Sequence, residues 1–342
     1  MLSILYKKLK EGSVQCLTCA NYCFLKEGQI GKCGLRQNNS NKLYFLPGKT
    51  VATENLDPIE KKPLFHFLPG SLALSLGGWG CNLKCSFCQN WELSQAPQDC
   101  IQKGLKNFPW GDKLDDDFVV NYCLQNNISS IAYTYNEPTV YLDAYLGLLK
   151  KAKKLGIKNI WITNGYLSPE SFLALKPYID AANIDLKSYS ENFYTKITGA
   201  HLKVVRENIK KFVAAGIWTE IATLIIPSLN DNPEELSQMA NFIANISLDM
   251  PWHLSAFFPA YKLTSLPATS ARILKKAYDI GIKAGLHYVY TGNLLPSLSP
   301  ENTYCPQCQF KLIERRGYTI LNNSLSNGCC PNCGYKIAGH WE

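Results

Sequence analysis

Short apolar segments alternate with amphipathic segments through the middle of the chain. The apolar segments have the length of buried strands, which are predicted at Leu72–Leu76, Ile128–Tyr133, Ile157–Thr163, Ala182–Asp185, Thr219–Ile226 and Trp252–Phe258. The segments between them predict helices near residues 115–126, 139–155, 169–177, 203–215, 233–246 and 269–284. In the second of these, apolar residues between Val140 and Leu155 recur with the period of one helix face, and Gly156 follows as a stop signal.

The six predicted strand–helix pairs follow one another without a hairpin turn between strands. This arrangement predicts an α/β fold with a parallel sheet. The periodicity alone is compatible with a partial barrel and with a doubly wound sheet. In both folds ligands gather at the carboxyl ends of the strands, so we expect the functional site there.

Cysteine is the unusual residue of the composition, because twelve of the fourteen cysteines lie in three tight groups. The groups are Cys16, Cys19, Cys23 and Cys33; Cys81, Cys85 and Cys88; and Cys305, Cys308, Cys329, Cys330 and Cys333. The sequence has no apolar run of about 18 residues and no signal-peptide core after Met1, so we expect a soluble cytoplasmic protein with no membrane contact. In a reducing cytosol, thiols separated by two or three residues indicate metal sites rather than disulfides.

The formal net charge of +8 is weak evidence for a nucleic-acid partner. Lysine and arginine are spread along the chain, with only short runs such as Lys150–Lys154. Two sites with four thiolates each, and one cluster held by three thiolates, would lower the charge to roughly +3. We therefore expect no nucleic-acid partner.

The middle cysteine group lies directly after the first predicted strand, behind the flexible bend Gly77–Gly80. Cys81, Cys85 and Cys88 place three thiolates on one short loop at the carboxyl end of a strand. A cubane iron–sulfur cluster is usually held by four cysteines, so three ligands leave one iron open, as a catalytic metal site requires. Two alternatives are a closed site that recruits Cys100 as fourth ligand, and a zinc site.

The spacing C-x3-C-x-aromatic-C after the first strand of a βα array resembles the radical S-adenosylmethionine (SAM) superfamily. The resemblance implies a partial (β/α)6 barrel of the TIM type in which Cys81, Cys85 and Cys88 are catalytic residues that hold a [4Fe-4S] cluster. It also implies that SAM chelates the open iron through its amino and carboxylate groups. Phe87, the aromatic residue of the motif, is expected to offer its edge to the bound cofactor.

Polar residues at the ends of later strands match SAM-binding positions of this superfamily. Where the superfamily has Gly-Gly-Glu after the second strand, this chain has Tyr135–Pro138, in which Asn136 and Glu137 can still accept hydrogen bonds from an ammonium group. The ends of the third and fourth strands resemble those of the glycyl-radical-enzyme activases, and the residues concerned are Thr163, Asn164, Asp185 and Lys187.

Charge suggests a role for two of these residues: Lys187 could pair with a carboxylate, and Asp185 with ribose hydroxyls or the ammonium group. A structural role is the alternative for every polar strand end. On the sixth strand, we expect His253 to pack in the core rather than to cover the adenine ring.

Longer segments resemble the radical SAM member of the AmmeMemoRadiSam system, whose proteins are often named as homologues of the pyruvate-formate-lyase-activating enzyme. The segments are Asp57–Gly70, Cys88–Glu92, Tyr133–Pro138 and Ile313–Gly317. The resemblance implies an AMMECR-type protein and a Memo-type protein as partners. It does not supply the substrate.

The activity implied by the resemblance begins with a reduced ferredoxin or flavodoxin as electron donor. Reductive cleavage of SAM would then give methionine and a 5′-deoxyadenosyl radical, which takes a hydrogen atom from the substrate. The substrate is a small molecule or a residue of a system partner, or alternatively a protein glycine, as in the activases. A zinc-ribbon protein that binds nucleic acid is a remote alternative.

Cysteine groups at both ends of the chain predict two further modules. The predicted domains are a four-cysteine module at residues 1–68, the (β/α)6 core at residues 69–300, and a second four-cysteine module at residues 301–342. The tail resembles a zinc ribbon or a rubredoxin, with Cys305, Cys308, Cys330 and Cys333 as zinc ligands and Cys329 as a bystander. The uneven spacing of Cys16, Cys19, Cys23 and Cys33 leaves zinc and an auxiliary iron–sulfur cluster open.

Charged residues crowd the segment just before the first strand. They line the barrel mouth or form a solvated linker with a packed histidine, and they are Asp57, Glu60, Lys61, Lys62 and His66.

Overall fold

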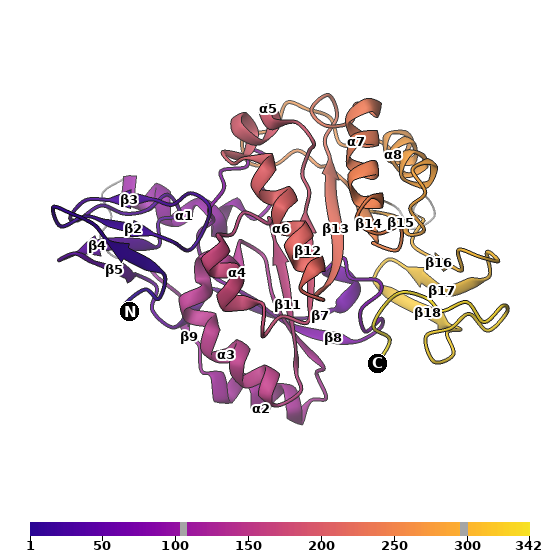
Figure 1. The fold of residues 1–342 in the computed structure, drawn as a ribbon, viewed down its shortest axis with the longest axis horizontal. Helices are drawn as coiled ribbons and strands as arrows, with labels where there is room; N and C mark the ends of the chain where they lie inside the picture. The colour runs from indigo at the N-terminus through magenta and orange to yellow at the C-terminus, as the bar shows by residue number, and fades with distance from the viewer. Residues whose placement is uncertain (103–107, 295–299) are drawn as a thin grey trace.

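A computed structural model describes residues 1–102, 108–294 and 300–342, and its centre is one eight-stranded sheet (Figure 1). The strand order is β15-β14-β13-β12-β11-β10-β8-β7. The strands are β7 (Thr53–Pro58), β8 (Leu72–Gly77), β10 (Ser130–Tyr133), β11 (Lys158–Thr163), β12 (Ala181–Asp185), β13 (Trp218–Ile225), β14 (Trp252–Ala256) and β15 (Val289–Gly292). From β8 to β15 all neighbours are parallel, and β7 pairs antiparallel with β8. The expected parallel βα fold is confirmed.

Helices connect the parallel strands. They are α1 (Trp91–Gln102), α2 (Asp116–Gln125), η2 (Pro138–Tyr141), α3 (Leu142–Lys154), α4 (Pro169–Leu175), α5 (Glu191–Phe193), η3 (Tyr194–Thr198), α6 (Leu202–Ala214), α7 (Pro233–Ala244) and α8 (Ala271–Lys283). Because the parallel strands are added in chain order without a reversal, the sheet is singly wound, and α3, α4, α6, α7 and α8 lie on one side of it (Figure 1). The fold is therefore a partial barrel rather than a doubly wound sheet.

All six predicted strands are found within two residues of their predicted ends, but the sheet has two further strands. β15 extends the parallel series by one strand beyond β14. β7 pairs with the other edge of β8, although its residues lie in the segment that the sequence predicted to be a separate N-terminal module. The position of β7 joins residues 53–58 to the core sheet. The exact division into domains at residues 68 and 300 stays a prediction.

The cysteine-bearing N-terminal region consists of short strands. They are β1 (Tyr6–Lys8), β2 (Val14–Cys16), β3 (Phe24–Leu25), β4 (Arg36–Asn39), β5 (Lys42–Phe45) and β6 (Thr50–Val51), with β6 paired to β9 (Asp112–Lys113). A fully buried ion pair between Arg36 and Asp143 ties this region to α3.

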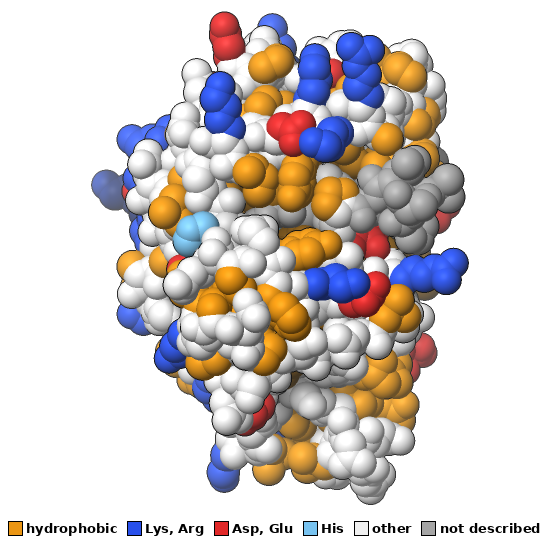
Figure 2. Space-filling model, turned by 90° about the vertical axis from the view of Figure 1, so that its right-hand side faces the viewer, with side chains coloured by type: hydrophobic (Ala, Val, Ile, Leu, Met, Phe, Trp, Pro, Cys, Tyr) orange, Lys and Arg blue, Asp and Glu red, His pale blue; other side chains and the backbone are white. Residues whose placement is uncertain are grey.

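The C-terminal region is a three-stranded antiparallel sheet of β16 (Thr303–Tyr304), β17 (Lys311–Arg316) and β18 (Thr319–Asn323). Its inner side chains Leu312 and Ile313 share a buried cluster with Phe65 and Tyr290. Figure 2 views the molecule from this side and shows hydrophobic side chains mixed with basic and acidic ones.

Residues 59–68, which include η1 (Ile59–Lys61), fill part of the space enclosed by the curved sheet. Leu64 and Phe67 pack there against Ala132 and Ile160 of β10 and β11. None of the helices in the described part of the chain is long and apolar enough to cross a membrane.

Candidate functional site

The loop Cys81–Cys88 follows a glycine bend at the carboxyl end of β8. A Cβ atom on Gly78 would lie 2.5 Å from the ring of Tyr141, and one on Gly80 would lie 2.6 Å from the carbonyl oxygen of Cys33. Gly80 also has a φ of +74°, which favours glycine. Glycine is therefore needed for the bend to fit between these neighbours.

The sulfur-bearing side chains of Cys81, Cys85 and Cys88 line one cavity. Burial, followed by repulsion from Glu137 and Cys85, raises the pKa of Cys81, so the thiols lie within electrostatic reach of one another. The three sulfur atoms do not all lie within 4.8 Å of one another, whereas thiolates around one zinc ion would be about 3.8 Å apart. In this structure the three thiols are therefore not arranged around a single ion.

Polar groups lie within hydrogen-bonding distance of two of the three sulfur atoms, those of Cys81 and Cys88. The backbone N–H of Leu83 donates to Cys81 Sγ over 3.4 Å, and Asn164 Nδ2 lies 3.7 Å from the same atom. Ser94 Oγ lies 3.3 Å from Cys88 Sγ. Such donors stabilise thiolate ligands and tune the cluster that they hold. Cys100, the alternative fourth ligand, does not line the cavity.

The cavity has a volume of about 360 Å³ and lies at the carboxyl ends of the parallel strands. It brings together most of the side chains that the sequence predicted. Those that line it are Cys81, Cys85, Phe87, Cys88, Asn136, Asn164, Asp185 and Lys187. Their contact with SAM stays a prediction.

Asp185 and Lys187 form an ion pair of 2.8 Å at the end of β12. Burial lowers the pKa of Lys187, but the charges of Asp185 and Cys85 outweigh it, so the net pKa is raised and the lysine is fully charged. The ammonium group also lies 5.8 Å from the centre of the Phe87 ring. A cation thus stands beside the cluster loop, where it can meet an anionic ligand group.

Asn136 lines the cavity and also braces the glycine bend. Its Nδ2 donates to the carbonyl oxygen of Gly80 over 2.7 Å, and its Oδ1 accepts from the backbone N–H of Gly78. The preceding residue, Tyr135, has a φ of +71°, in the left-handed region that favours glycine. The backbone at Tyr135 therefore has a conformation that glycine would adopt more readily.

Glu137 and Thr163 lie behind the cavity wall instead of lining it. Glu137 is fully buried, and its carboxylate accepts from the backbone N–H groups of Thr139 and Asn164 and from Thr163 Oγ1, at 2.8 to 3.0 Å. Burial raises the pKa of Glu137, although these donors oppose the shift. In this structure Glu137 positions Asn164, which does line the cavity.

Several lining residues were missed by the sequence analysis. They are Tyr135, Asn183, Ser255 and Asn293. Asn183 stands two residues before Asp185 on the same strand, so the alternation of strand faces was the signal that could have found it. Its Nδ2 donates to the carbonyl oxygen of Pro63 over 2.7 Å and so fixes the interior segment to the sheet.

A second cavity of about 350 Å³ adjoins the first, because Pro63, Ser255 and Asn293 line both. It lies among residues 60–65, strands β14 and β15, and the C-terminal sheet. The two cavities therefore share part of their wall.

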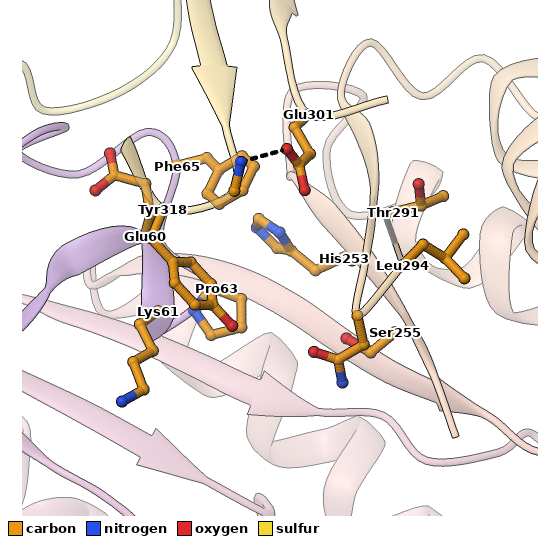
Figure 3. Close-up of a pocket in the computed structure, with 13 residues that line it drawn as sticks. Glu60, Lys61, Pro63, Phe65, His253, Ser255, Thr291, Leu294, Glu301 and Tyr318 are labelled. Carbon is orange, nitrogen blue, oxygen red and sulfur yellow. Dashed lines mark hydrogen bonds between the residues drawn. The ribbon is translucent and has the colours of Figure 1, made fainter. Parts of the chain in front are cut away.

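Figure 3 shows how three parts of the chain enclose the second cavity. Glu60 and Lys61 stand on one side together with Tyr318 of the C-terminal sheet, and Leu294 stands on the opposite side. The lining therefore combines an acid, a base, a phenol and apolar surface.

The charged residues before β8 are mostly buried, so they are not a solvated linker. Asp57 accepts from Lys61, Lys62, Ser75 and Tyr135 at 2.7 to 3.0 Å. Burial alone would raise the pKa of Asp57, but the two lysines lower it strongly. This carboxylate is charged and fully paired.

His66 is fully buried and belongs to the core. Its ring lies 2.8 Å from the carbonyl oxygen of Ala338 and 2.7 Å from the hydroxyl of Tyr290. Its backbone N–H donates to Glu220, which also accepts from His253 Nε2 over 2.6 Å. His253 is thus buried with a carboxylate partner, as predicted, but it also lines the second cavity (Figure 3).

The C-terminal cysteines form a compact group. The sulfur atoms of Cys305 and Cys333 are 3.6 Å apart and those of Cys308 and Cys330 are 3.7 Å apart, with all four within 4.8 Å. This matches the tetrahedral spacing of about 3.8 Å around one thiolate-bound ion. The four tail cysteines could therefore hold one metal ion, and Cys329 lies outside this group.

Comparisons with known proteins agree with this site. The family model of the radical SAM superfamily matches residues 78–243. The chain is 39% identical over 338 residues to the uncharacterized protein MJ0808 of Methanocaldococcus jannaschii, covering 98% of both chains. It is 24% identical over 174 residues to the pyruvate formate-lyase-activating enzyme of Clostridium pasteurianum, covering 49% of this chain and 67% of that enzyme.

A solved structure shares the fold. The crystal structure of Streptococcus suis SuiB bound to S-adenosylmethionine superposes with a TM-score of 0.51 at 17% identity, over 72% of this chain and 56% of SuiB. The family match covers the cysteine loop and most of the parallel strands around the cavity. The chain therefore belongs to the radical SAM superfamily, a family of enzymes that cleave SAM.

Proposed function

We propose that this enzyme takes a hydrogen atom from a small molecule, or from a side chain of a partner protein, within the AmmeMemoRadiSam system. The single observation that carries the SAM chemistry is the cavity at the strand ends, where three thiols and the Asp185–Lys187 pair face one space. System membership rests on the resemblance of the segments Asp57–Gly70 and Ile313–Gly317.

The residues of the first cavity suit a [4Fe-4S] cluster and SAM. Such a cluster, held by Cys81, Cys85 and Cys88, supplies the electron for reductive cleavage of SAM to methionine and a 5′-deoxyadenosyl radical. In this proposal Lys187 pairs with the carboxylate of SAM, and Asn136 and Asn164 accept from its ammonium group; all three residues line the cavity. Phe87 offers its ring beside them.

The substrate chamber is the second cavity. Its size suits a small molecule or one extended side chain, and it shares a wall with the SAM cavity. Holding the substrate there keeps the reacting atoms close and excludes water from a radical. The C-terminal sheet closes one side through Tyr318, which restricts entry of a bulky folded loop.

The alternative substrate is a protein glycine. The similarity to the pyruvate formate-lyase-activating enzyme of Clostridium pasteurianum supports it, but that similarity covers only half of this chain. A glycyl-radical EPR signal on an added candidate enzyme would establish this alternative instead.

A nucleic-acid-binding role has little physical support. On the face that carries the C-terminal sheet, lysine and arginine side chains are dispersed among hydrophobic and acidic ones rather than arranged in a stripe (Figure 2). The tail metal is proposed to be zinc, because its four thiolates close the site and leave no open position. The proposed electron donor is a reduced ferredoxin or flavodoxin, the proposed partners are the AMMECR-type and Memo-type proteins, and the proposed location is the cytoplasm.

The test is incubation of the anaerobically purified protein with SAM and dithionite, with 5′-deoxyadenosine as the product measured. Wild type is expected to form the nucleoside, and Cys85→Ala is expected to form none. Cys100→Ala is the matched control, because Cys100 does not line the cavity, and it should behave as wild type. Equal nucleoside formation by Cys85→Ala and wild type would contradict the assigned cluster.

A further inference from the structure

The four N-terminal cysteines are gathered in one pocket of the protein. Cys16 ends β2, and its backbone N–H donates to the carbonyl oxygen of Cys23. Cys16, Cys19 and Cys33 are buried and Cys23 is half-buried. The backbone N–H of Tyr22 donates to the carbonyl oxygen of Cys19, and a Cβ atom on Gly31, two residues before Cys33, would lie 3.7 Å from Cys23 Sγ, so the segments that carry the four thiols lie side by side.

Their sulfur atoms are nevertheless too far apart for one zinc ion. Within residues 1–102, 108–294 and 300–342, the tail cysteines are the only group of three or more potential ligands whose atoms lie within 4.8 Å of one another. Zinc with bonds of about 2.3 Å requires thiolates about 3.8 Å apart, as in the tail. In a cubane the thiolates bind four separate irons, so they are spread to about 6 Å apart.

The Cys81–Cys88 loop provides an internal reference for the wide spacing. Its three thiols line one cavity without forming a group within 4.8 Å. The N-terminal cysteines likewise form no such group and differ from the compact tail. Among the described residues, the tail cysteines are thus spaced for a single ion, and the other two groups are not.

A polar side chain lies beside the N-terminal thiols. The Sγ atom of Cys16 lies 3.5 Å from Thr18 Oγ1. Polar groups next to thiolate ligands tune the metal centre that these ligands hold.

The N-terminal pocket contacts the Cys81–Cys88 loop directly. The carbonyl oxygen of Cys33 lies against Gly80. Asn21 Nδ2 donates to the carbonyl oxygen of Asn82 over 2.8 Å. Asn82 Nδ2 in turn donates to the carbonyl oxygen of Tyr166, which also accepts from the backbone N–H of Ala20, the residue after Cys19. None of the four N-terminal cysteines lines either cavity, so this site does not touch SAM or substrate.

We propose that Cys16, Cys19, Cys23 and Cys33 hold a second [4Fe-4S] cluster, which transfers electrons to the cluster at Cys81, Cys85 and Cys88. A reduced ferredoxin or flavodoxin loses one electron, the N-terminal cluster gains it, and the same electron passes on to the catalytic cluster. The electron-transfer role rests on the proposed function. The presence of a second cluster at Cys16, Cys19, Cys23 and Cys33 does not.

The decisive experiment removes the catalytic cluster and leaves the N-terminal one. After anaerobic reconstitution with iron and sulfide, the variant C81A/C85A/C88A is expected to keep about four irons and about four sulfides per chain. Its reduced form should give a cluster EPR signal that SAM does not change. A variant that holds zinc but no iron, or about two irons, overturns the proposal.

A second variant keeps the proposal testable if the triple variant does not fold. Cys23→Ser changes the least buried ligand, and wild-type iron should fall from about eight to about four per chain. The control is Cys329→Ser, a half-buried cysteine outside the metal groups, which should keep all the iron. Wild type with about four irons and two zinc ions overturns the proposal.

The transfer role has its own measurement. In Cys23→Ser, dithionite should still support formation of 5′-deoxyadenosine, because it can reduce the catalytic cluster directly, whereas reduced flavodoxin should support only background formation. Equal support by both reductants would overturn the transfer role. If wild type carries about eight irons but forms no nucleoside with either reductant, the proposed function fails and the second cluster stands.

Discussion

The substitution Glu137→Gln separates a positioning role from direct contact with SAM. The Glu137 carboxylate accepts from two backbone N–H groups, those of Thr139 and Asn164. A glutamine presents one NH₂ group in the same space, so in either orientation one backbone N–H faces another donor. An unpaired buried donor costs about 1 to 3 kcal/mol.

Losing the hydrogen bond from the Asn164 backbone N–H should weaken SAM binding, because Asn164 lines the cavity. If most of this cost is expressed as a shift of Asn164 away from its SAM-binding position, the Kd for SAM should rise about tenfold. The cost of about 1 to 3 kcal/mol corresponds to a range of about 5- to 150-fold. The assay is a SAM titration followed by the change in the EPR signal of the reduced cluster, with iron content measured on the same samples.

Glu220→Gln is the matched control. Glu220 is also fully buried and accepts from the backbone N–H groups of Phe65 and His66, but it lies away from the SAM cavity. Both variants should lose thermal stability, and only Glu137→Gln should lose SAM affinity. An unchanged Kd in Glu137→Gln with full iron content would refute the reasoning.

Three further outcomes are expected. Lys187→Met should raise the Kd for SAM about tenfold or more without loss of iron, as the same titration would show, because a charge-assisted hydrogen bond is lost. Cys308→Ser should remove the tail metal and leave the iron content unchanged, which elemental analysis measures; unchanged zinc would contradict the tail site. Burial lowers the pKa of His66 to about 4, below its value of about 6.5 in an unfolded chain. The unfolded state therefore binds the proton first, and stability should fall by about 1 kcal/mol between pH 7 and pH 5.5. Thermal unfolding of His66→Gln should show a smaller pH dependence than wild type, and equal slopes would contradict this assignment.

The regular part of the fold was predictable because buried parallel strands and amphipathic helices have clear periods. β15 was missed although it is as long as β10, and β7 was missed because its sequence, Thr53–Pro58, is polar and lies at a sheet edge. α1 was missed because it contains Pro97 and has no continuous apolar face. Such elements depend on tertiary contacts, which local patterns do not encode.

The candidate site was predictable where one segment carries the chemistry. The spacing of Cys81, Cys85 and Cys88 indicates the cluster without any structure. The role of Glu137 was not predictable, because its three donors come from residues that the fold brings behind the cavity wall. The second cavity is lined by both Lys61 and Tyr318, which are far apart in the sequence. They come together only when the C-terminal tail folds against residues 60–65.

The interior segment depends on residues that are synthesised much later. The ring of His66 contacts the carbonyl oxygen of Ala338, 272 positions further along, and the backbone groups of His66 and Leu68 exchange hydrogen bonds with His340. While a ribosome is still making the barrel, these buried backbone groups have no partners within the nascent chain. The second cavity can therefore assume its final form only after residue 340 has emerged from the ribosome, and a stalled chain should remain sensitive to proteases at residues 59–68.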